Sequence, residues 1–218
     1  MVSAMRFGLE IDGSRQLTPS LVHAVEAACA EAEREGFLAV SVTAVPDDTH
    51  AYADVALVSK WERALRRLER LPATTVSVAS GAVGGIALDT LLATDYRIAT
   101  PDTRLELAPS GGAAWPGMAL YRLVQQAGLA PIRRTVLLGH PLTATKATEL
   151  GLVDEITGAP AAALAAAAAA AGLRSGRELA IRRQLMRDAA TVSFEEALGA
   201  HLAACDRMLR QAASGAGR

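Results

Sequence analysis

Aromatic residues, cysteines and an excess of either charge are all scarce in this sequence. Phe, Tyr and Trp make up 4% of the 218 residues, and 22 Lys and Arg are balanced by 23 Asp and Glu, for a net charge of −1. A chain without a basic excess has no overall electrostatic attraction to nucleic acid or to an acidic membrane surface. We therefore predict neither nucleic acid nor a membrane as a partner.

The two cysteines, Cys29 and Cys205, stand far apart and have no C-x-x-C spacing. Isolated cysteines of this kind indicate buried free thiols in a reducing compartment rather than a disulfide, and no metal site is predicted. The first residues lack an apolar leader segment, and no apolar run has the length and character of a membrane span. The sequence therefore predicts a cytoplasmic protein.

Hydrophobic residues are abundant: at 51% they suffice for one compact α/β domain with a large core. The central stretch of this domain runs from Thr74 to Ala99. A β-branched apolar run leads there through Gly81, Gly84 and Gly85 into an apolar segment, and a second short apolar run follows. This order predicts a strand, a glycine turn, a helix and another strand. A helix that begins at such a turn directs its free N–H groups at a negatively charged ligand.

The familiar glycine motifs are absent from this stretch. Its glycines are spaced neither as the dinucleotide-binding G-x-G-x-x-G nor as a P-loop, and the chain has no G-x-S-x-G nucleophile elbow. The turn therefore needs another interpretation.

The segments before the central stretch read as an alternation of strands and helices. The pattern predicts a strand over Phe7–Ile11, a helix capped by Thr18 and ended by Gly36, and a strand over Leu38–Val45. His23 lies beside the apolar face of that helix, and we interpret it as structural.

A charged helix is predicted over Lys60–Glu69. Glu62 and Arg66 are spaced i to i+4, so we interpret most of this charge as a solvated face stabilised by ion pairs. Lys60 or an arginine of the helix is the alternative, as a contact for a ligand phosphate.

The segments after the central stretch are mainly helical. Residues 1–158 are predicted to form the core and residues 159–218 a C-terminal helical region. His140 follows a glycine in a loop, and we interpret it as structural. The expected elements are helices over Trp115–Gln126, from Thr143 to Gly151, over Ala159–Ala171, over Glu178–Ala189 and over Phe194–Gln211 with a capping box of Ser193 and Glu196, and a strand over Val153–Ile156.

Several short segments between about Leu71 and Ile156 form an ordered set: Ser80-Gly81, Gly85-Ile86-Ala87, Asp89, Asp95-Tyr96-Arg97-Ile98-Ala99, Trp115-Pro116-Gly117, Leu137-Leu138-Gly139 and the run from Ala147 to Glu155. In this order they resemble the crotonase superfamily of enoyl-CoA hydratases and isomerases. The resemblance implies an α/β fold, a crotonase-like spiral of ββα repeats with C-terminal helices that cover the core or form an oligomer. It also implies a homo-oligomer based on trimers, and an acyl-CoA thioester as substrate, with coenzyme A part of that substrate and no separate cofactor.

The resemblance places a site at the start of the central helix. Ala51-Tyr52-Ala53-Asp54 is similar to the loop that supplies one N–H of the family's oxyanion hole, and Ile86 stands at the position of the second. The backbone N–H groups of Ala53 and Ile86 are therefore expected to hold the thioester oxygen as it gains negative charge. Asp89 stands at the position of one catalytic carboxylate.

The second carboxylate of the family's pattern is missing. Pro109 stands at its position, and Glu106 is the nearest acid. The sequence leaves two interpretations of Asp89 open: a single acid and base, or a carboxylate at the start of a helix with no catalytic role. Its apolar neighbours disfavour the charged form, whereas a place in the first helical turn favours it.

Three further segments, Lys60–Glu69, Trp115–Arg122 and Phe194–Leu202, resemble small crotonase-like proteins of 3,5-dihydroxyphenylglycine biosynthesis in producers of glycopeptide antibiotics. This resemblance implies a hydratase or dehydratase that acts in forming 3,5-dihydroxyphenylacetyl-CoA. The alternative is an accessory protein without independent chemistry that binds an acyl-CoA or enhances a partner, a type III polyketide synthase or a second crotonase-like enzyme. A third hypothesis is a structural α/β protein with no CoA site.

Overall fold

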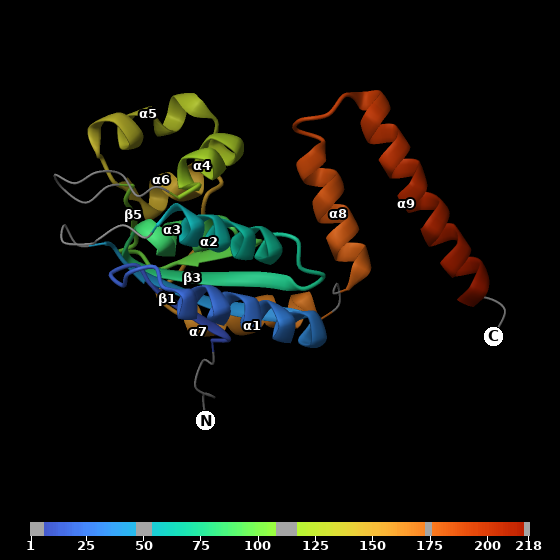
Figure 1. Cartoon of the computed structure of the whole chain (residues 1–218), viewed down its shortest axis with the longest axis horizontal. Helices are drawn as coiled ribbons and strands as arrows, with labels where there is room; N and C mark the ends of the chain where they lie inside the picture. The colour runs from blue at the N-terminus through green and yellow to red at the C-terminus, as the bar shows by residue number, and fades with distance from the viewer. Residues whose placement is uncertain (1–6, 47–53, 108–116, 173–175, 216–218) are drawn as a thin grey trace.

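The computed structural model describes residues 7–46, 54–107, 117–172 and 176–215. A parallel sheet lies at its centre (Figure 1). Parallel strands need crossover connections, which the helices between them provide. In spatial order the five strands of the main path are β1 (Leu9–Asp12), β2 (Phe37–Ala44), β3 (Thr74–Val83), β4 (Tyr96–Ala99) and β7 (Glu155–Ile156).

Strand β3 is the longest of these strands, and the sheet branches along it. Its first half pairs with β4, and its last residues pair with β5 (Arg104–Leu105), which in turn pairs antiparallel with β6 (Leu142–Thr143). The register between β2 and β3 shifts after Thr43, and Gly81 adopts a φ of +65° beside this shift. A bulge of this kind bends the strand, so that its carboxyl end leaves the main path.

One face of the sheet is covered by α1 (Pro19–Glu35), α2 (Val55–Leu68) and α3 (Gly85–Leu92), which share a single apolar core with the strands. The start and end of α1 agree with the sequence pattern. Thr18 Oγ1 accepts a hydrogen bond from the backbone N–H of Leu21, at 3.2 Å, and Gly36 ends the helix at a φ of 76°.

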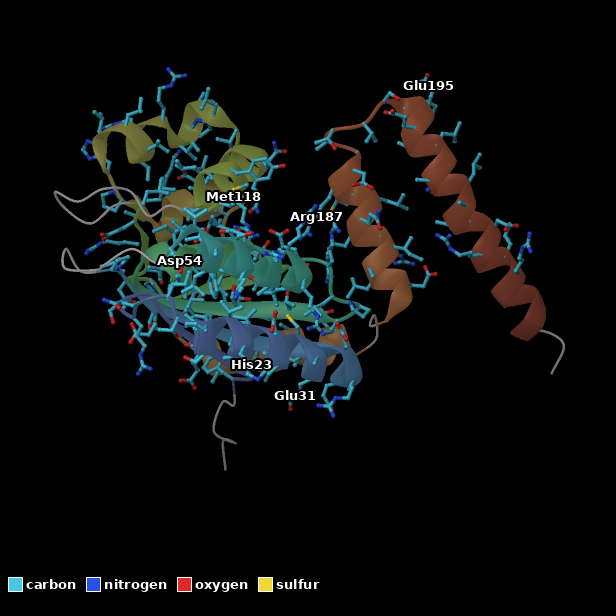
Figure 2. The ribbon with its side chains drawn as sticks, viewed as in Figure 1. His23, Glu31, Asp54, Met118, Arg187 and Glu195 are labelled. Atoms are coloured by element: carbon cyan, nitrogen blue, oxygen red, sulfur yellow. The ribbon has the colours of Figure 1, made fainter. Side chains whose placement is uncertain are left out.

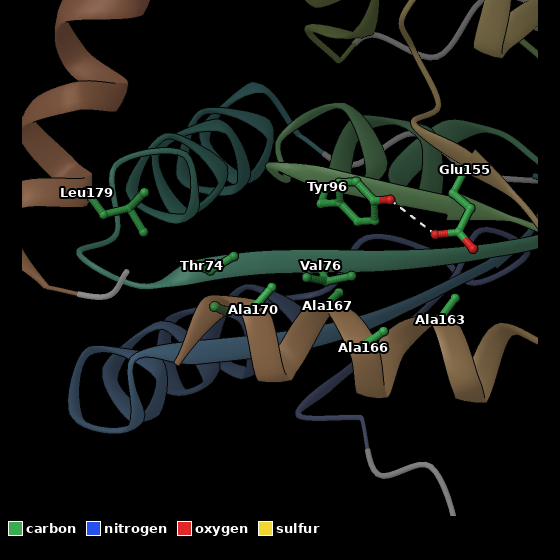
Figure 3. Close-up of a pocket in the computed structure, with 10 residues that line it drawn as sticks. Thr74, Val76, Tyr96, Glu155, Ala163, Ala166, Ala167, Ala170 and Leu179 are labelled. Carbon is green, nitrogen blue, oxygen red and sulfur yellow. Dashed lines mark hydrogen bonds between the residues drawn. The ribbon is translucent and has the colours of Figure 1, made fainter. Parts of the chain in front are cut away.

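Helix α7 (Pro160–Ala171) covers the opposite face, where a smaller apolar cluster contains Val76, Ile98 and Leu164 (Figure 1). Most residues of α7 are alanines, whose short side chains leave space above the strands. A cavity of about 480 Å³ remains there, and the hydroxyl of Tyr96 donates a hydrogen bond to Glu155 at its edge (Figure 3).

The remaining helices are α4 (Ala119–Ala127), α5 (Leu129–Leu138), α6 (Ala144–Glu149), α8 (Arg177–Asp188) and α9 (Phe194–Gly215). Helices α8 and α9 lie beside each other, and α9 stands away from the sheet (Figure 1). Among the helices in the described ranges, none is both long and apolar enough to cross a membrane.

The α/β fold predicted from the sequence is confirmed, and so is the strand, glycine turn, helix and strand of the central stretch. Thr143 caps α6, and Ser193 and Glu196 form the predicted capping box of α9. The helix predicted from Trp115 begins only at Ala119, because Gly117 disfavours a helical start. Helix α5 and the two-residue strands β5 and β6 were not predicted. The division of the chain at residue 158 stays a prediction.

The interpretation of both cysteines as buried is correct for one of them. Cys29 is buried within α1, and burial raises the pKa of its thiol to about 11. Cys205 is only half-buried, since it lies on α9 away from the core, and both cysteines are free.

Candidate functional site

The start of α3 lies at the carboxyl edge of the sheet, where the ends of three strands meet. A Cβ on Gly13, after β1, would lie 2.3 Å from the carbonyl oxygen of Ala44, at the end of β2. A Cβ on Gly84, after β3, would lie 2.9 Å from the carbonyl oxygen of Glu106. A Cβ on Gly85 would lie 2.5 Å from Cγ of Pro46. Only residues without a side chain allow the backbone to approach so closely. Glycine therefore fixes where α3 begins.

Ile86 is the second residue of α3, and it is 1% exposed. The first N–H groups of a helix have no partner one turn earlier within the helix, and that of Ile86 is one of them, so it can donate to a ligand at this end. Ala53 and Pro109 lie outside the described residues. Asp54, directly after Ala53, caps α2 by accepting a hydrogen bond from the backbone N–H of Leu57, at 2.7 Å.

Asp89 lies on α3 one turn after Ile86 and is fully buried. The prediction that it occupies the first turn is wrong, because α3 begins at Gly85 and Asp89 is its fifth residue. The effect of the helix N-terminus is confined to the first turn, so it favours the charged form less than expected. A guanidinium provides positive charge instead: Nη1 of Arg122 lies 3.8 Å from Oδ1 of Asp89.

Arg122, on α4, is itself buried among carboxylates from α2. Its Nη2 lies 2.9 Å from Oε2 of Glu62, and its Nε donates a hydrogen bond of 2.8 Å to Oε1 of Glu69. Glu62 also accepts a hydrogen bond from the backbone N–H of Met118, which lies at the start of α4 above α2 (Figure 2). Burial alone would lower the pKa of Arg122, but the carboxylates raise it above its ordinary value. The guanidinium therefore stays charged.

This network corrects the interpretation of the charged helix. Glu62 does not pair with Arg66 on a solvated face; it faces α4, and Arg66 pairs instead with Glu69 at 2.7 Å. Burial would raise the pKa of Glu69, but hydrogen bonds from Arg122 and Arg66 lower it below the ordinary value. A signal was present in the sequence, because Glu62 and Glu69 are seven residues apart and so lie on the same helix face. Nothing in the sequence identified Arg122 as their partner.

A cleft of about 460 Å³ opens beside this network, between α2 and α4. Ser59 and Arg63 line it on α2, Tyr121 lines it on α4, and Arg122 lies between it and Asp89. Such walls can donate and accept several hydrogen bonds with a polar ligand. Glu106 is half-buried, and its backbone contacts the start of α3.

The other candidate residues do not join this site. His23, His140 and Lys60 are exposed, and the structural interpretation of the two histidines stays a prediction. Among the described residues, no group of three or more His, Cys, Asp or Glu side chains is arranged to hold a metal ion.

A family model for enoyl-CoA hydratase/isomerase matches residues 47–216. The chain belongs to this family. A relative named enoyl-CoA-hydratase, from Amycolatopsis orientalis, is 54% identical over 210 residues, which cover 94% of this chain and 97% of the relative. The enoyl-CoA hydratase/isomerase family thus includes relatives of the same length.

Solved structures show the same fold. An enoyl-CoA hydratase from Shewanella pealeana is 18% identical with a TM-score of 0.76, over 94% of this chain and 86% of that one. An enoyl-CoA hydratase from Polaromonas is 17% identical with a TM-score of 0.76, over 97% of this chain and 92% of that one. At such identities the likeness establishes the crotonase fold alone.

Proposed function

We propose that this chain binds an acyl-CoA thioester and catalyses its hydration or the reverse dehydration. The observation that supports this most directly is the spacing of Ile86 and Asp89 on α3. Three residues apart, they lie on one side of the helix, with an N–H donor at the helix start and a carboxylate one turn further on. A donor and an acid held by one rigid helix can act on two atoms of the same substrate.

In the dehydration direction, the carboxylate of Asp89 removes a proton from the carbon next to the thioester carbonyl. The electron pair moves onto the carbonyl oxygen, where the N–H groups of Ile86 and Ala53 stabilise it, by about 3 kcal/mol for each donor in comparable sites. The enolate then expels the hydroxyl group from the neighbouring carbon. Asp89 returns its proton to this hydroxyl, which leaves as water, and the carboxylate is restored.

The acyl group that we propose is polar, as in the formation of 3,5-dihydroxyphenylacetyl-CoA for dihydroxyphenylglycine biosynthesis. The cleft between α2 and α4 supports this choice, because Ser59, Arg63 and Tyr121 can bond to carbonyl and hydroxyl groups. A hydrocarbon chain would form no hydrogen bond with these groups.

A second candidate function is that of an accessory protein, and the position of Arg122 favours it. Its guanidinium faces Asp89, and both side chains are buried. Arg122 lies between Asp89 and the cleft, so its guanidinium stands where a substrate would have to reach the carboxylate. In this case the chain would bind an acyl-CoA and enhance a type III polyketide synthase or a second crotonase-like enzyme.

Asp89→Asn distinguishes the two functions. For the enzyme, we expect turnover of crotonyl-CoA by the wild type and a loss of at least about 100-fold in kcat for the variant, since proton transfer contributes this much or more. Coenzyme A affinity, followed by calorimetry, should stay within twofold. Asp206→Asn, the same change on an exposed part of α9, is the control and should keep full activity.

The opposite result supports the accessory protein: no turnover by either form, unchanged binding of coenzyme A, and a partner synthase whose rate rises on mixing with wild type and Asp89→Asn alike. Equal turnover of crotonyl-CoA by wild type and variant would exclude Asp89 as the acid.

We also propose a homo-oligomer based on trimers. Large apolar side chains stand exposed on the C-terminal helices, among them Met186 on α8 and Phe194, Leu202 and Leu209 on α9. An apolar surface of this extent is typical of an interface with another chain. Light scattering after gel filtration measures the mass directly, and a monomer at micromolar concentration would exclude this proposal.

A further inference from the structure

A second cleft, of about 700 Å³, lies at the opposite edge of the sheet from the start of α3. Thr74, the first residue of β3, and Asp95, directly before β4, line one wall. Helix α8 forms the other wall, with Arg183 and Arg187. The cleft thus lies at the amino ends of the strands, whereas the candidate site for an acyl-CoA lies at their carboxyl ends.

The walls of this cleft carry an excess of positive charge: four arginines, Arg97, Arg182, Arg183 and Arg187, against two aspartates, Asp95 and Asp154. Both aspartates already have protein partners. Asp95 lies 2.6 Å from Nη2 of Arg183, and Asp154 accepts a hydrogen bond of 2.8 Å from the backbone N–H of Arg97. Asp95 is committed to Arg183, so Asp154 is the other carboxylate that lines the cleft beside the remaining three arginines. Arg187 has a further carboxylate behind the cleft wall, since its Nη1 lies 3.8 Å from Oε2 of Glu69.

Arg97 shows this excess most clearly, because it is only 8% exposed. The hydrogen bonds of its guanidinium go to neutral acceptors: the carbonyl oxygens of Leu92, Thr94 and Leu152, and the side-chain oxygen of Gln126. Its buried Nε–H has no acceptor among the described residues. Burial lowers the pKa of Arg97 to about 10, although the negative charges of Asp154 and Asp95 oppose this shift. A buried cation among neutral acceptors is stabilised when an anion approaches it.

The arginines of α8 bring further positive charge to the same cleft. Arg187, which lies on the side of α8 that faces the sheet (Figure 2), donates a hydrogen bond of 2.6 Å to the backbone oxygen of Glu69. Burial lowers its pKa; the negative charges of Glu69 and Asp95 oppose this shift, and the positive charges of Arg183 and Arg66 add to it. Arg182 is exposed and forms no salt bridge within the described residues. Several guanidinium groups thus repel one another around one hollow, and a bound anion would remove this repulsion.

We propose that this cleft binds a small molecule through a phosphate group. A phosphate carries about two negative charges near neutral pH, and its oxygens match the fork of N–H donors on arginine. A carboxylate has half of that charge. The volume of the cleft leaves space for an organic part beside the phosphate. The same group occurs in free phosphorylated metabolites and in coenzyme A, so the ligand comes from one of these two sources.

The test uses the full chain and inorganic phosphate, at an ionic strength held constant with sodium chloride. We expect saturable binding by calorimetry, with affinity about tenfold weaker for Arg182→Gln. Arg182 is exposed, so this change should leave the fold intact, which circular dichroism verifies. Arg207→Gln on α9 removes the same charge outside the cleft and should bind phosphate as the wild type does. Acetate should bind at least tenfold more weakly than phosphate.

Equal affinity of Arg182→Gln and wild type for phosphate would overturn the proposal, and so would absence of saturable binding. Competition between phosphate and coenzyme A, lost in Arg182→Gln, would identify coenzyme A as the source of the group. Independent binding of the two would support a separate phosphorylated metabolite. The measurement needs no turnover, so its failure is distinguishable from a failure of the hydratase proposal.

Discussion

Helices α3 and α7 cover opposite faces of one sheet and fill the adjoining space differently. All eight residues of α3 are buried, and at its start the N-cap Gly84 and the first residue Gly85 leave no space for a Cβ beside Glu106 and Pro46. Helix α7 buries only Leu164 and Ala171, and a cavity of about 480 Å³ remains beneath it (Figure 3). The comparison shows that apolar composition alone does not produce tight packing; the sizes of the facing side chains must also match.

The largest effect is expected where α3 is packed most tightly. Gly85→Ala places a Cβ 2.5 Å from Cγ of Pro46 and a side chain at a φ of +53°, so we expect a loss of about 4 kcal/mol in unfolding free energy. Gly151→Ala is the matched control, since Gly151 has a φ of +67° but open space around its Cβ; it should lose about 1 kcal/mol. Urea denaturation measures both. Equal losses would show that contact with Pro46 has no influence.

A smaller loss is expected in the ion network beside α3. Glu69→Gln leaves the buried Arg122 without its closest carboxylate, and we expect a loss of about 3 kcal/mol. Glu33→Gln breaks an exposed pair with Arg67, in which both side chains are 41% exposed, and should cost less than about 1 kcal/mol.

The network also makes stability depend on pH. The pKa of Glu69 in the folded protein lies below its ordinary value of 4.5, so its contribution is complete above that value. It is lost as the pH falls through the lower, folded pKa. Urea titrations between pH 7 and pH 3 should therefore show a steeper loss of stability for wild type than for Glu69→Gln. Parallel curves would contradict this account.

On the other face, filling the cavity should stabilise the protein. Ala167 lines the cavity, and Ala167→Leu adds three carbon atoms to it, so we expect a gain of about 1 kcal/mol, the burial gain less the entropy of fixing the side chain. Ala165→Leu on the exposed side of α7 is the control and should be nearly neutral. A loss of stability in Ala167→Leu would mean that the space beneath α7 is too small for the added carbon atoms.

The smallest effect concerns the two thiols and leaves stability unchanged. Burial raises the pKa of Cys29 to about 11, so at pH 8 it is protonated as well as inaccessible. We expect one thiol per chain, Cys205, to react with Ellman's reagent in the native protein and two after denaturation. Cys205→Ser should abolish the native reaction.

Local signals allowed much of the fold to be predicted. The caps at Thr18 and Gly36 depend on neighbouring residues, and the structure has both. The glycine turn before α3 was found in the same way, because its residues are adjacent in the chain. Strands β5 and β6 have two residues each, too few for a periodic pattern.

Long-range partners could not be predicted in this way. Asp89 was found through its place in an ordered set of motifs, but its neighbour Arg122 was not, because 33 residues separate them and no local pattern joins α3 to α4. The arginine cleft was missed for the same reason. Arg183 hydrogen-bonds the backbone oxygens of Leu71 and Ala73, more than 100 residues earlier in the chain. Only the folded chain brings such groups together.

The hydrogen bonds to the carboxylate and backbone oxygens of Glu69 indicate the order in which helices pack during folding. These oxygens accept hydrogen bonds from three arginines. Arg66 on α2 is 3 residues away in the sequence, Arg122 on α4 is 53 residues away, and Arg187 on α8 is 118 residues away. The entropy cost of closing a loop rises with its length, so the bond within α2 can form first and the one to α8 last. We expect α8 to dock late in folding and to detach first under mild denaturant, which would appear as early hydrogen exchange in α8 and α9 while α3 remains protected.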